Sequence, residues 1–233
     1  MNRFYKTVTT AEKSDGWVIL LDERPVKTPD KQTLSLPAIA LAQAIVEEWR
    51  AQKDEFDPLT MPLTRYANAA IDRTSKMRSD VIDQVCAYGN SDVLCYRVDQ
   101  PADLAELQKE EWQPVLDWLS KVHEIKLMST AGIVQVDQDN AAVQKIQQLV
   151  SSFDVFRLTA LHAATAACGS IVLALALADG QIDTQTALQC ATLEERYQMK
   201  VWGEDEETIR RHDELSVEIE SAARFMSLAL PGA

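Results

Sequence analysis

Hydrophobic and polar positions in the first third of the chain follow the pattern of short strands. Runs rich in β-branched and aromatic residues occupy positions 4–9, 17–21, 26–28 and 33–36. Turn residues separate them at 13–16 and at 22–25, where Asp, Gly, Pro and Ser gather. Strand residues alternating with turn signals predict successive antiparallel hairpins.

From residue 37 onward the period changes to that of a helix. Leu41, Ile45 and Trp49 stand at i, i+4 and i+8, on one helix face that follows Pro37 at a favoured first position. Prolines 58 and 62 are predicted to end this helix. Beyond residue 67 the pattern stays helical: Pro101 opens a long helix, and further helices are expected at 140–151, 154–178, 183–201 and 204–230.

These patterns predict an α+β fold, with a small N-terminal antiparallel β domain followed by a larger, mostly helical domain. The predicted boundary separates a β-rich domain with one helix, residues 1–66, from a helical domain, residues 67–233. A chain of 233 residues is long enough to bury a sizeable core in this arrangement.

An uncharged run covers residues 158–178 and has the length of a membrane span. Against membrane insertion stand His162, Thr165 and Gly169 within the run, many alanines, and flanks without basic anchors. We therefore expect a central buried helix and no stable membrane insertion. A membrane-associated protein that uses this run stays the alternative.

The composition limits which binding partners and which cellular compartment are expected for this protein. The net charge of −13 repels phosphate backbones, so no nucleic acid is expected as a partner. Cys86, Cys95, Cys168 and Cys190 lack zinc-site spacing, and Cys168 is expected to be a buried, reduced thiol. The start lacks a signal sequence or presequence, which favours a bacterial cytoplasmic protein, or the mitochondrial matrix for a processed organellar form.

Motifs for catalysis are absent from the sequence. It contains neither G-x-x-x-x-G-K-[ST] nor G-x-G-x-x-G, so no nucleotide is expected. Metal ligation by His123-Glu124 or by the run that starts at His212 is disfavoured, because adjacent helix residues point about 100° apart. The pairs Glu47-Glu48 and Glu110-Glu111 are interpreted as solvated faces. We expect no metal, no cofactor and no enzymatic activity.

The strongest candidate for a binding site is an acidic block beside an indole. Trp202 and Gly203 precede four consecutive acids, Glu204, Asp205, Glu206 and Glu207. Acids in the first turn of a helix are favoured by its dipole, which explains part of the block. The dipole does not explain why four acids stand next to a tryptophan. This combination is typical of a binding surface in which the aromatic ring is the anchor and the charges attract a basic partner. The predicted partner-binding residues are Glu204 first, then Asp205, Glu207 and Trp202.

The alternative function for this block is a metal- or nucleotide-dependent enzyme with an acidic site at residues 204–207. The block lacks the alternating oxygen ligands and the central glycine of an EF-hand calcium loop. From the residues alone, the sequence indicates an acidic α+β protein that acts by binding.

Eight segments, in order along nearly the whole chain, resemble one family. They are RFYK at 3–6, LLDERPVKTP at 20–29, LPAIALAQAIVEEW at 36–49, DPLTMPLTRYANAAID at 57–72, SDVLCYR at 91–97, WQPVLDW at 112–118, GSIVLALAL at 169–177 and YQMKVWGEDEE at 197–207. The family is that of assembly chaperones for the catalytic sector of F-type ATP synthase, which bind the free alpha subunit. It usually has glycine in the early D-G-R-P turn, where this chain has Glu23.

The resemblance implies a fold and a function. The fold is an N-terminal antiparallel β domain with a C-terminal helical domain. The function is to hold the unassembled ATP synthase alpha subunit and prevent its aggregation until the beta subunit replaces the chaperone. At the Glu23 turn we expect strain or a changed turn type, because a non-glycine residue disfavours positive φ.

Overall fold

The computed structural model describes residues 3–132 and 136–230, and it confirms the α+β class. The described residues form two compact units. Unit 1 is drawn from residues 1–81, 153–160 and 224–233, and unit 2 from residues 82–152 and 161–223. A division into separate domains at residue 66 stays a prediction.

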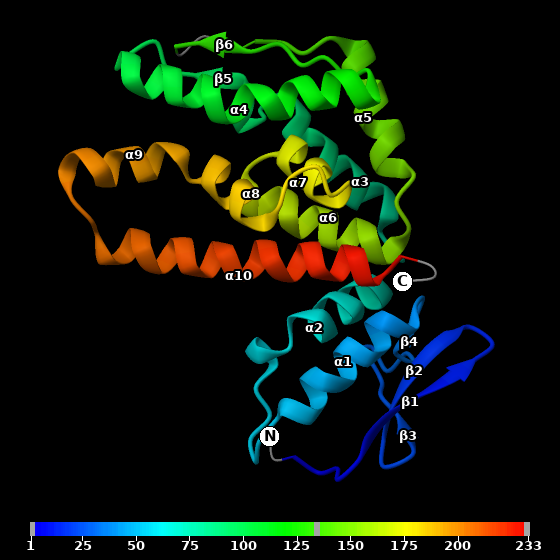
Figure 1. The fold of residues 1–233 in the computed structure, drawn as a ribbon. Helices are drawn as coiled ribbons and strands as arrows, with labels where there is room; N and C mark the ends of the chain where they lie inside the picture. The colour runs from blue at the N-terminus through cyan, green and yellow to red at the C-terminus, as the bar shows by residue number, and fades with distance from the viewer. Residues whose placement is uncertain (1–2, 133–135, 231–233) are drawn as a thin grey trace. The chain divides into compact units, whose positions relative to one another are not determined.

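The sheet of unit 1 is built on one long hairpin. Strand β1 (Val8–Lys13) pairs antiparallel with β2 (Gly16–Leu21), from Val8↔Leu21 to Lys13↔Gly16. Two short strands, β3 (Arg24–Pro25) and β4 (Ser35–Leu36), also pair antiparallel with β2 (Figure 1). The predicted antiparallel hairpins are confirmed, although the first strand starts at Val8 and not at Phe4.

Helix α1 (Ile39–Ala51) covers this sheet. Its predicted stripe is its buried face: Leu41 and Ile45 are fully buried and Trp49 is nearly so. The helix begins two residues after Pro37, because Ala38 keeps an extended backbone and serves as the N-cap.

Left-handed residues close the turn between β2 and β3. Asp22 has φ 45° and Glu23 has φ 70°, which is the geometry of the tight hairpin turns that favour glycine. The Asp22 carboxylate accepts hydrogen bonds from the backbone N–H groups of Lys6 and Thr7, and these bonds lower its pKa. Glu23 therefore adopts the positive φ at which strain was expected for a residue other than glycine.

Replacing Glu23 with glycine is expected to stabilise the protein by about 1 kcal/mol, because glycine adopts this conformation without steric cost. Urea denaturation of Glu23→Gly and the unchanged protein measures the difference. The matched control is Glu12→Gly in strand β1, which should destabilise, since glycine weakens a strand. Equal or lower stability of Glu23→Gly would mean that the turn is not strained.

The remainder of unit 1 becomes helical earlier than predicted. After the short helix η1 (Pro58–Thr60) come α2 (Pro62–Ala69) and the π-helical turn η2 (Ala70–Thr74). Pro62 starts α2, because its missing N–H and fixed φ suit a first helical position.

The interpretation of Glu48 as a solvated residue was wrong. Its carboxylate accepts hydrogen bonds from the N–H groups of Leu63 (2.7 Å) and Thr64 (2.8 Å), at the start of α2. Burial raises the Glu48 pKa despite these bonds. Glu111 also has a partner, since Arg196 donates to it at 2.7 Å, whereas Glu47 and Glu110 are exposed as expected.

Helices and short turns make up the first half of unit 2, and a parallel pair of two-residue strands joins them. The elements from residue 78 onward are α3 (Arg78–Ala87), η3 (Tyr88–Asn90), η4 (Val93–Cys95), β5 (Tyr96–Arg97), α4 (Ala102–His123), β6 (Thr130–Ala131) and α5 (Asn140–Ser151). Trp112 and Trp118 on α4 are buried, as predicted for core residues. The β5–β6 pairing was not predicted.

The uncharged run is two helices, so the single helix predicted at 154–178 was wrong. Helix α6 (Val155–Cys168) ends at Gly169, whose φ is 62°, and α7 (Ile171–Ala178) begins after Ser170. The Ser170 hydroxyl caps α7 by accepting from the Leu173 N–H. Within the described residues, no helix is long and apolar enough to cross a membrane.

Helix α7 lies at the centre of unit 2, and residues 171–176 are almost completely inaccessible. Asp92 lies at the start of this helix and is also fully buried. Its carboxylate accepts hydrogen bonds from the Ser170 hydroxyl (2.8 Å) and from the Val172 N–H (3.1 Å). The same carboxylate accepts from the Leu94 N–H. Burial raises the pKa of Asp92 to about 6.

The last part of unit 2 also contains an extra break. The expected helix at 183–201 is α8 (Thr184–Ala191) and α9 (Leu193–Trp202), separated at Thr192. The final helix, α10 (Glu206–Leu228), begins two residues later than predicted and buries Ile219, Ala222 and Met226, as expected.

Candidate functional site

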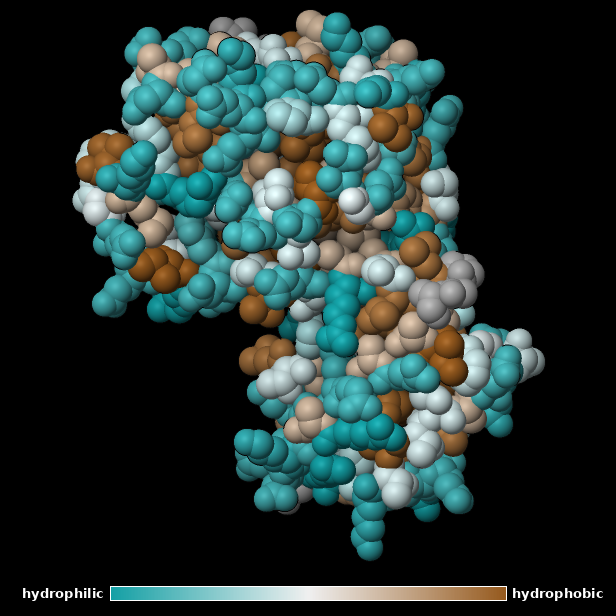
Figure 2. Space-filling view, in the orientation of Figure 1, coloured by the Kyte–Doolittle hydropathy of each residue, from teal (hydrophilic) through white to brown (hydrophobic). Residues whose placement is uncertain are grey.

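The four predicted binding residues meet at one exposed turn of unit 2, where α9 ends and α10 begins (Figure 1, left). Gly203 makes the turn with φ 101°, a conformation that an L side chain rarely adopts. Residues 201–209 are called the α9–α10 tip below. Figure 2 shows hydrophobic residues among hydrophilic ones at this end of the two helices.

Trp202 projects from the tip with 78% of its surface exposed. Two further apolar residues of the tip, which the sequence analysis missed, are also exposed: Val201 by 50% and Ile209 by 38%. Ile209 is seven positions from Trp202 and lies in the next helix, α10. The tip therefore exposes three apolar side chains, and exposed apolar side chains are common at interaction surfaces.

Asp205 has a structural role. Its carboxylate accepts from the Thr208 hydroxyl (2.6 Å) and from the N–H groups of Thr208 (3.0 Å) and Glu207 (3.4 Å). These hydrogen bonds, led by the one from the Thr208 hydroxyl, lower the Asp205 pKa. Asp205 is thus the N-cap of α10, and the helix-start explanation of the acidic block applies to this residue.

Glu204 and Glu207 differ from Asp205, because both are exposed and their carboxylates have no hydrogen bond or ion pair with any part of the chain that the structure describes. Together with exposed Glu206 they form a negative rim next to Trp202. These charges remain available for an external cation.

Contacts between α9 and α10 hold the tip in place. Glu195 on α9 forms an ion pair with Arg211. Its carboxylate also lies 2.8 Å from His212 Nε2, which is hydrogen-bond distance. Burial, and then the nearby Arg211, lower the pKa of His212. Tyr197 donates to Asp103 at 2.9 Å, which ties α9 to the start of α4. The tip is therefore carried on a braced pair of helices.

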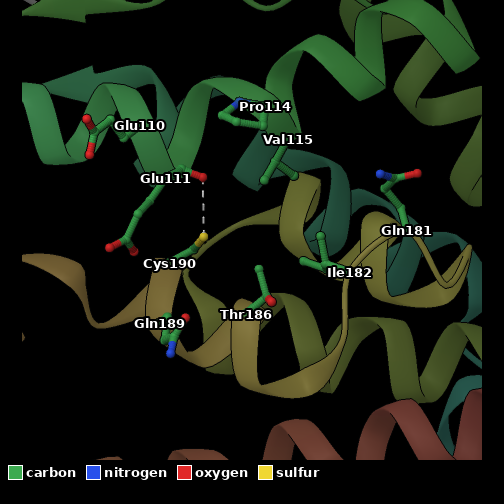
Figure 3. A pocket seen from close by; sticks show the side chains of 9 residues that line it. All are labelled: Glu110, Glu111, Pro114, Val115, Gln181, Ile182, Thr186, Gln189 and Cys190. Atoms are coloured by element: carbon green, nitrogen blue, oxygen red, sulfur yellow. Dashed lines mark hydrogen bonds between the residues drawn. The ribbon is translucent and has the colours of Figure 1, made fainter.

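A hollow of about 340 Å³ lies in unit 2 beside α4 and α8 (Figure 3). Cys190 lies in its wall and contacts the Glu111 backbone oxygen at 3.6 Å. Burial raises the Cys190 pKa to about 11, so the thiol is protonated and not nucleophilic. Across the described ranges, no three His, Cys, Asp or Glu residues cluster as metal ligands would.

The other cysteines are also free thiols, and Cys168 is buried as predicted. Burial raises the pKa of Cys86 to about 11 and those of Cys95 and Cys168 to about 12.

Comparisons with known proteins agree with a binding role. The sequence profile of the ATP12 chaperone protein family matches residues 2–120. Protein atp12, mitochondrial, of Schizosaccharomyces pombe is 26% identical over 225 residues, which cover 91% of this chain and 77% of that protein. The crystal structure of Atp12 from Paracoccus denitrificans has a TM-score of 0.96 and 39% identity, with 98% of both chains covered. A point mutant of the Paracoccus protein matches with a TM-score of 0.95 and the same identity and coverage.

These relatives define the protein as an assembly chaperone and not an enzyme. The chain belongs to the ATP12 chaperone protein family, which confirms the resemblance to the assembly chaperones of ATP synthase.

Proposed function

We propose that this chaperone binds the unassembled alpha subunit of ATP synthase through the α9–α10 tip and prevents its aggregation until the beta subunit replaces it. The observation that supports the proposal best is the exposed Trp202 beside the unpaired carboxylates of Glu204 and Glu207. Asp205 contributes by fixing the start of α10.

The two kinds of side chain at the tip have different roles. An exposed indole offers a large rigid surface, and tryptophan is enriched among residues that dominate binding energy. The carboxylates attract a basic surface and set its orientation. The residues that we propose for partner binding are Trp202, Glu204, Asp205 and Glu207, with Glu204 as the main electrostatic contact.

Handover to the beta subunit needs no chemical step in this scheme. A free alpha subunit exposes an interface meant for permanent contact, and such interfaces are large and apolar. The chaperone covers part of it, and the beta subunit displaces the chaperone because its contact is larger and tighter. We propose that this takes place in the bacterial cytoplasm or, for a processed organellar form, in the mitochondrial matrix, in line with the bacterial and mitochondrial relatives.

Co-expression with the alpha subunit of the same organism tests the proposal. We expect a complex with alpha alone that is recovered by affinity purification at low salt. Supplying the beta subunit should release the chaperone. High salt should weaken the complex, because the rim charges are exposed and screened. Failure to recover alpha at low salt, or an equal amount of complex with beta present, would contradict the proposal.

A further inference from the structure

A groove in unit 1 has the properties of a second docking surface. It consists of two neighbouring hollows of about 480 and 510 Å³, which share Val26, Lys27 and Trp49 in their walls. Each volume falls within the range of about 300–1,000 Å³ that is usual for ligand sites. We call this surface the Trp49 groove.

Three residues that line the Trp49 groove, Phe4, Trp49 and Phe56, belong to a chain of contacting aromatic rings that Tyr5 completes. Ring centroids are 5.5 Å apart for Phe4 and Tyr5, 5.6 Å for Tyr5 and Trp49, and 5.3 Å for Trp49 and Phe56. The Tyr5 hydroxyl donates to the Trp49 carbonyl at 2.7 Å, which fixes the centre of the row. Phe4 at its end is 72% exposed. A large exposed ring at the end of an apolar row is a surface that binding would cover.

One continuous segment of the chain contributes to both hollows. Residues 24–29, which begin with strand β3, contribute consecutively to the two hollows. Pro25 and Pro29 lack a backbone N–H, so this wall offers few donors for pairing with another strand. A continuous wall with few backbone donors fits an extended chain that is held mainly by its side chains.

The charges at the Trp49 groove are opposite to those of the whole chain. Three cationic side chains line it, Arg24, Lys27 and Arg65, in a protein with a net charge of −13. The single acidic residue in the lining, Asp22, uses its carboxylate to accept from the N–H groups of Lys6 and Thr7. Among the described residues, Arg24 and Lys27 form no ion pair through their side chains. The groove is therefore complementary to an apolar ligand that carries negative charge.

Two polar atoms in the walls also lack partners. Trp49 Nε1 and Asn68 Oδ1 are buried, and neither has a hydrogen bond within the described part of the chain. An unpaired buried donor and acceptor cost free energy. A peptide backbone carries a carbonyl and an N–H that match this donor and this acceptor.

We propose that the Trp49 groove binds an extended apolar segment that carries acidic side chains, contributed by the client subunit. This is a second contact, made by unit 1, with a charge preference opposite to that of the α9–α10 tip. The identity of the client rests on the proposed function, whereas the preference of the groove does not.

A labelled synthetic peptide tests the preference without the client. The probe is a ten-residue peptide of valine and leucine with two glutamates, and its partner has lysines in place of the glutamates. Fluorescence anisotropy with the full chain should give at least about tenfold tighter binding for the glutamate peptide. Lys27→Glu and Phe4→Ser should each weaken it about tenfold.

Matched controls make the result specific. Lys13→Glu changes the same charge on an exposed lysine outside the groove, and Val122→Ser removes an exposed apolar side chain of unit 2. Both should bind the glutamate peptide like the unchanged protein, and thermal unfolding should confirm that every variant is folded. Equal binding of the two peptides, or no effect of Lys27→Glu, would overturn the proposal. Peptide binding without recovery of the alpha subunit would keep the groove and remove the proposed client.

Discussion

Glu204→Lys is expected to weaken capture of the alpha subunit by at least about 30-fold, equivalent to about 2 kcal/mol, without unfolding the chaperone. The carboxylate of Glu204 is exposed and has no partner among the described residues, so reversing its charge removes no internal contact. The new cation would face a basic surface next to the Trp202 anchor. The measurement is affinity for purified alpha subunit, together with the melting temperature.

The control for this variant is Glu214→Lys. Glu214 lies on the same helix, is exposed, and gives the same change in net charge. It should retain capture, because it lies outside the α9–α10 tip. Loss of structure in Glu204→Lys would mean that this residue supports the start of α10 as Asp205 does. Equal loss of capture in both variants would mean that only the overall charge matters.

Asp92→Ala is expected to lower the free energy of unfolding by about 3 kcal/mol, because it leaves buried donors of Ser170, Val172 and Leu94 without their acceptor. Urea denaturation at neutral pH measures the loss. Asp137→Ala, at an exposed position of the same unit, should change stability by no more than about 0.5 kcal/mol. A small effect of Asp92→Ala would show that water replaces the carboxylate.

Ionisation of Asp92 gives this prediction a pH dependence. Its pKa is raised from 3.8 to about 6 in the folded protein, so the native state holds this proton more tightly than the unfolded state. The resulting stabilisation is fully present below pH 3.8 and is lost as the pH rises through about 6. Stability relative to Asp92→Asn should therefore fall between these pH values, and a constant difference would contradict the raised pKa.

Local sequence patterns predicted the features that neighbouring residues determine. The stripe of Leu41, Ile45 and Trp49 is the buried face of α1, since side chains four apart share one face. The tip was found because Trp202 and the acidic block are contiguous, although the division of roles between Asp205 and Glu204 depends on side-chain geometry. Their part in client binding remains a prediction.

Features that depend on distant residues were not predictable in the same way. Asp92 caps α7 from 78 positions away through Ser170, and Glu48 caps α2 from another helix. The breaks at Gly169 and Thr192 interrupt continuous helical patterns, because single residues there adopt non-helical geometry within otherwise favourable segments. The Trp49 groove combines residues 4, 24–29, 49 and 56–68, which no local period connects.

The four protonated cysteines form a covalent link between this protein and a bound partner only slowly, because protonated thiols react slowly. With pKa values of about 11 to 12, no more than about one thiol in ten thousand is ionised at pH 7. Mixed disulfides form through the thiolate, so covalent trapping of a partner by exchange is slow for this chain. A client bound as we propose would therefore be held by reversible contacts alone, and oxidising conditions would not cross-link it to the chaperone through these thiols.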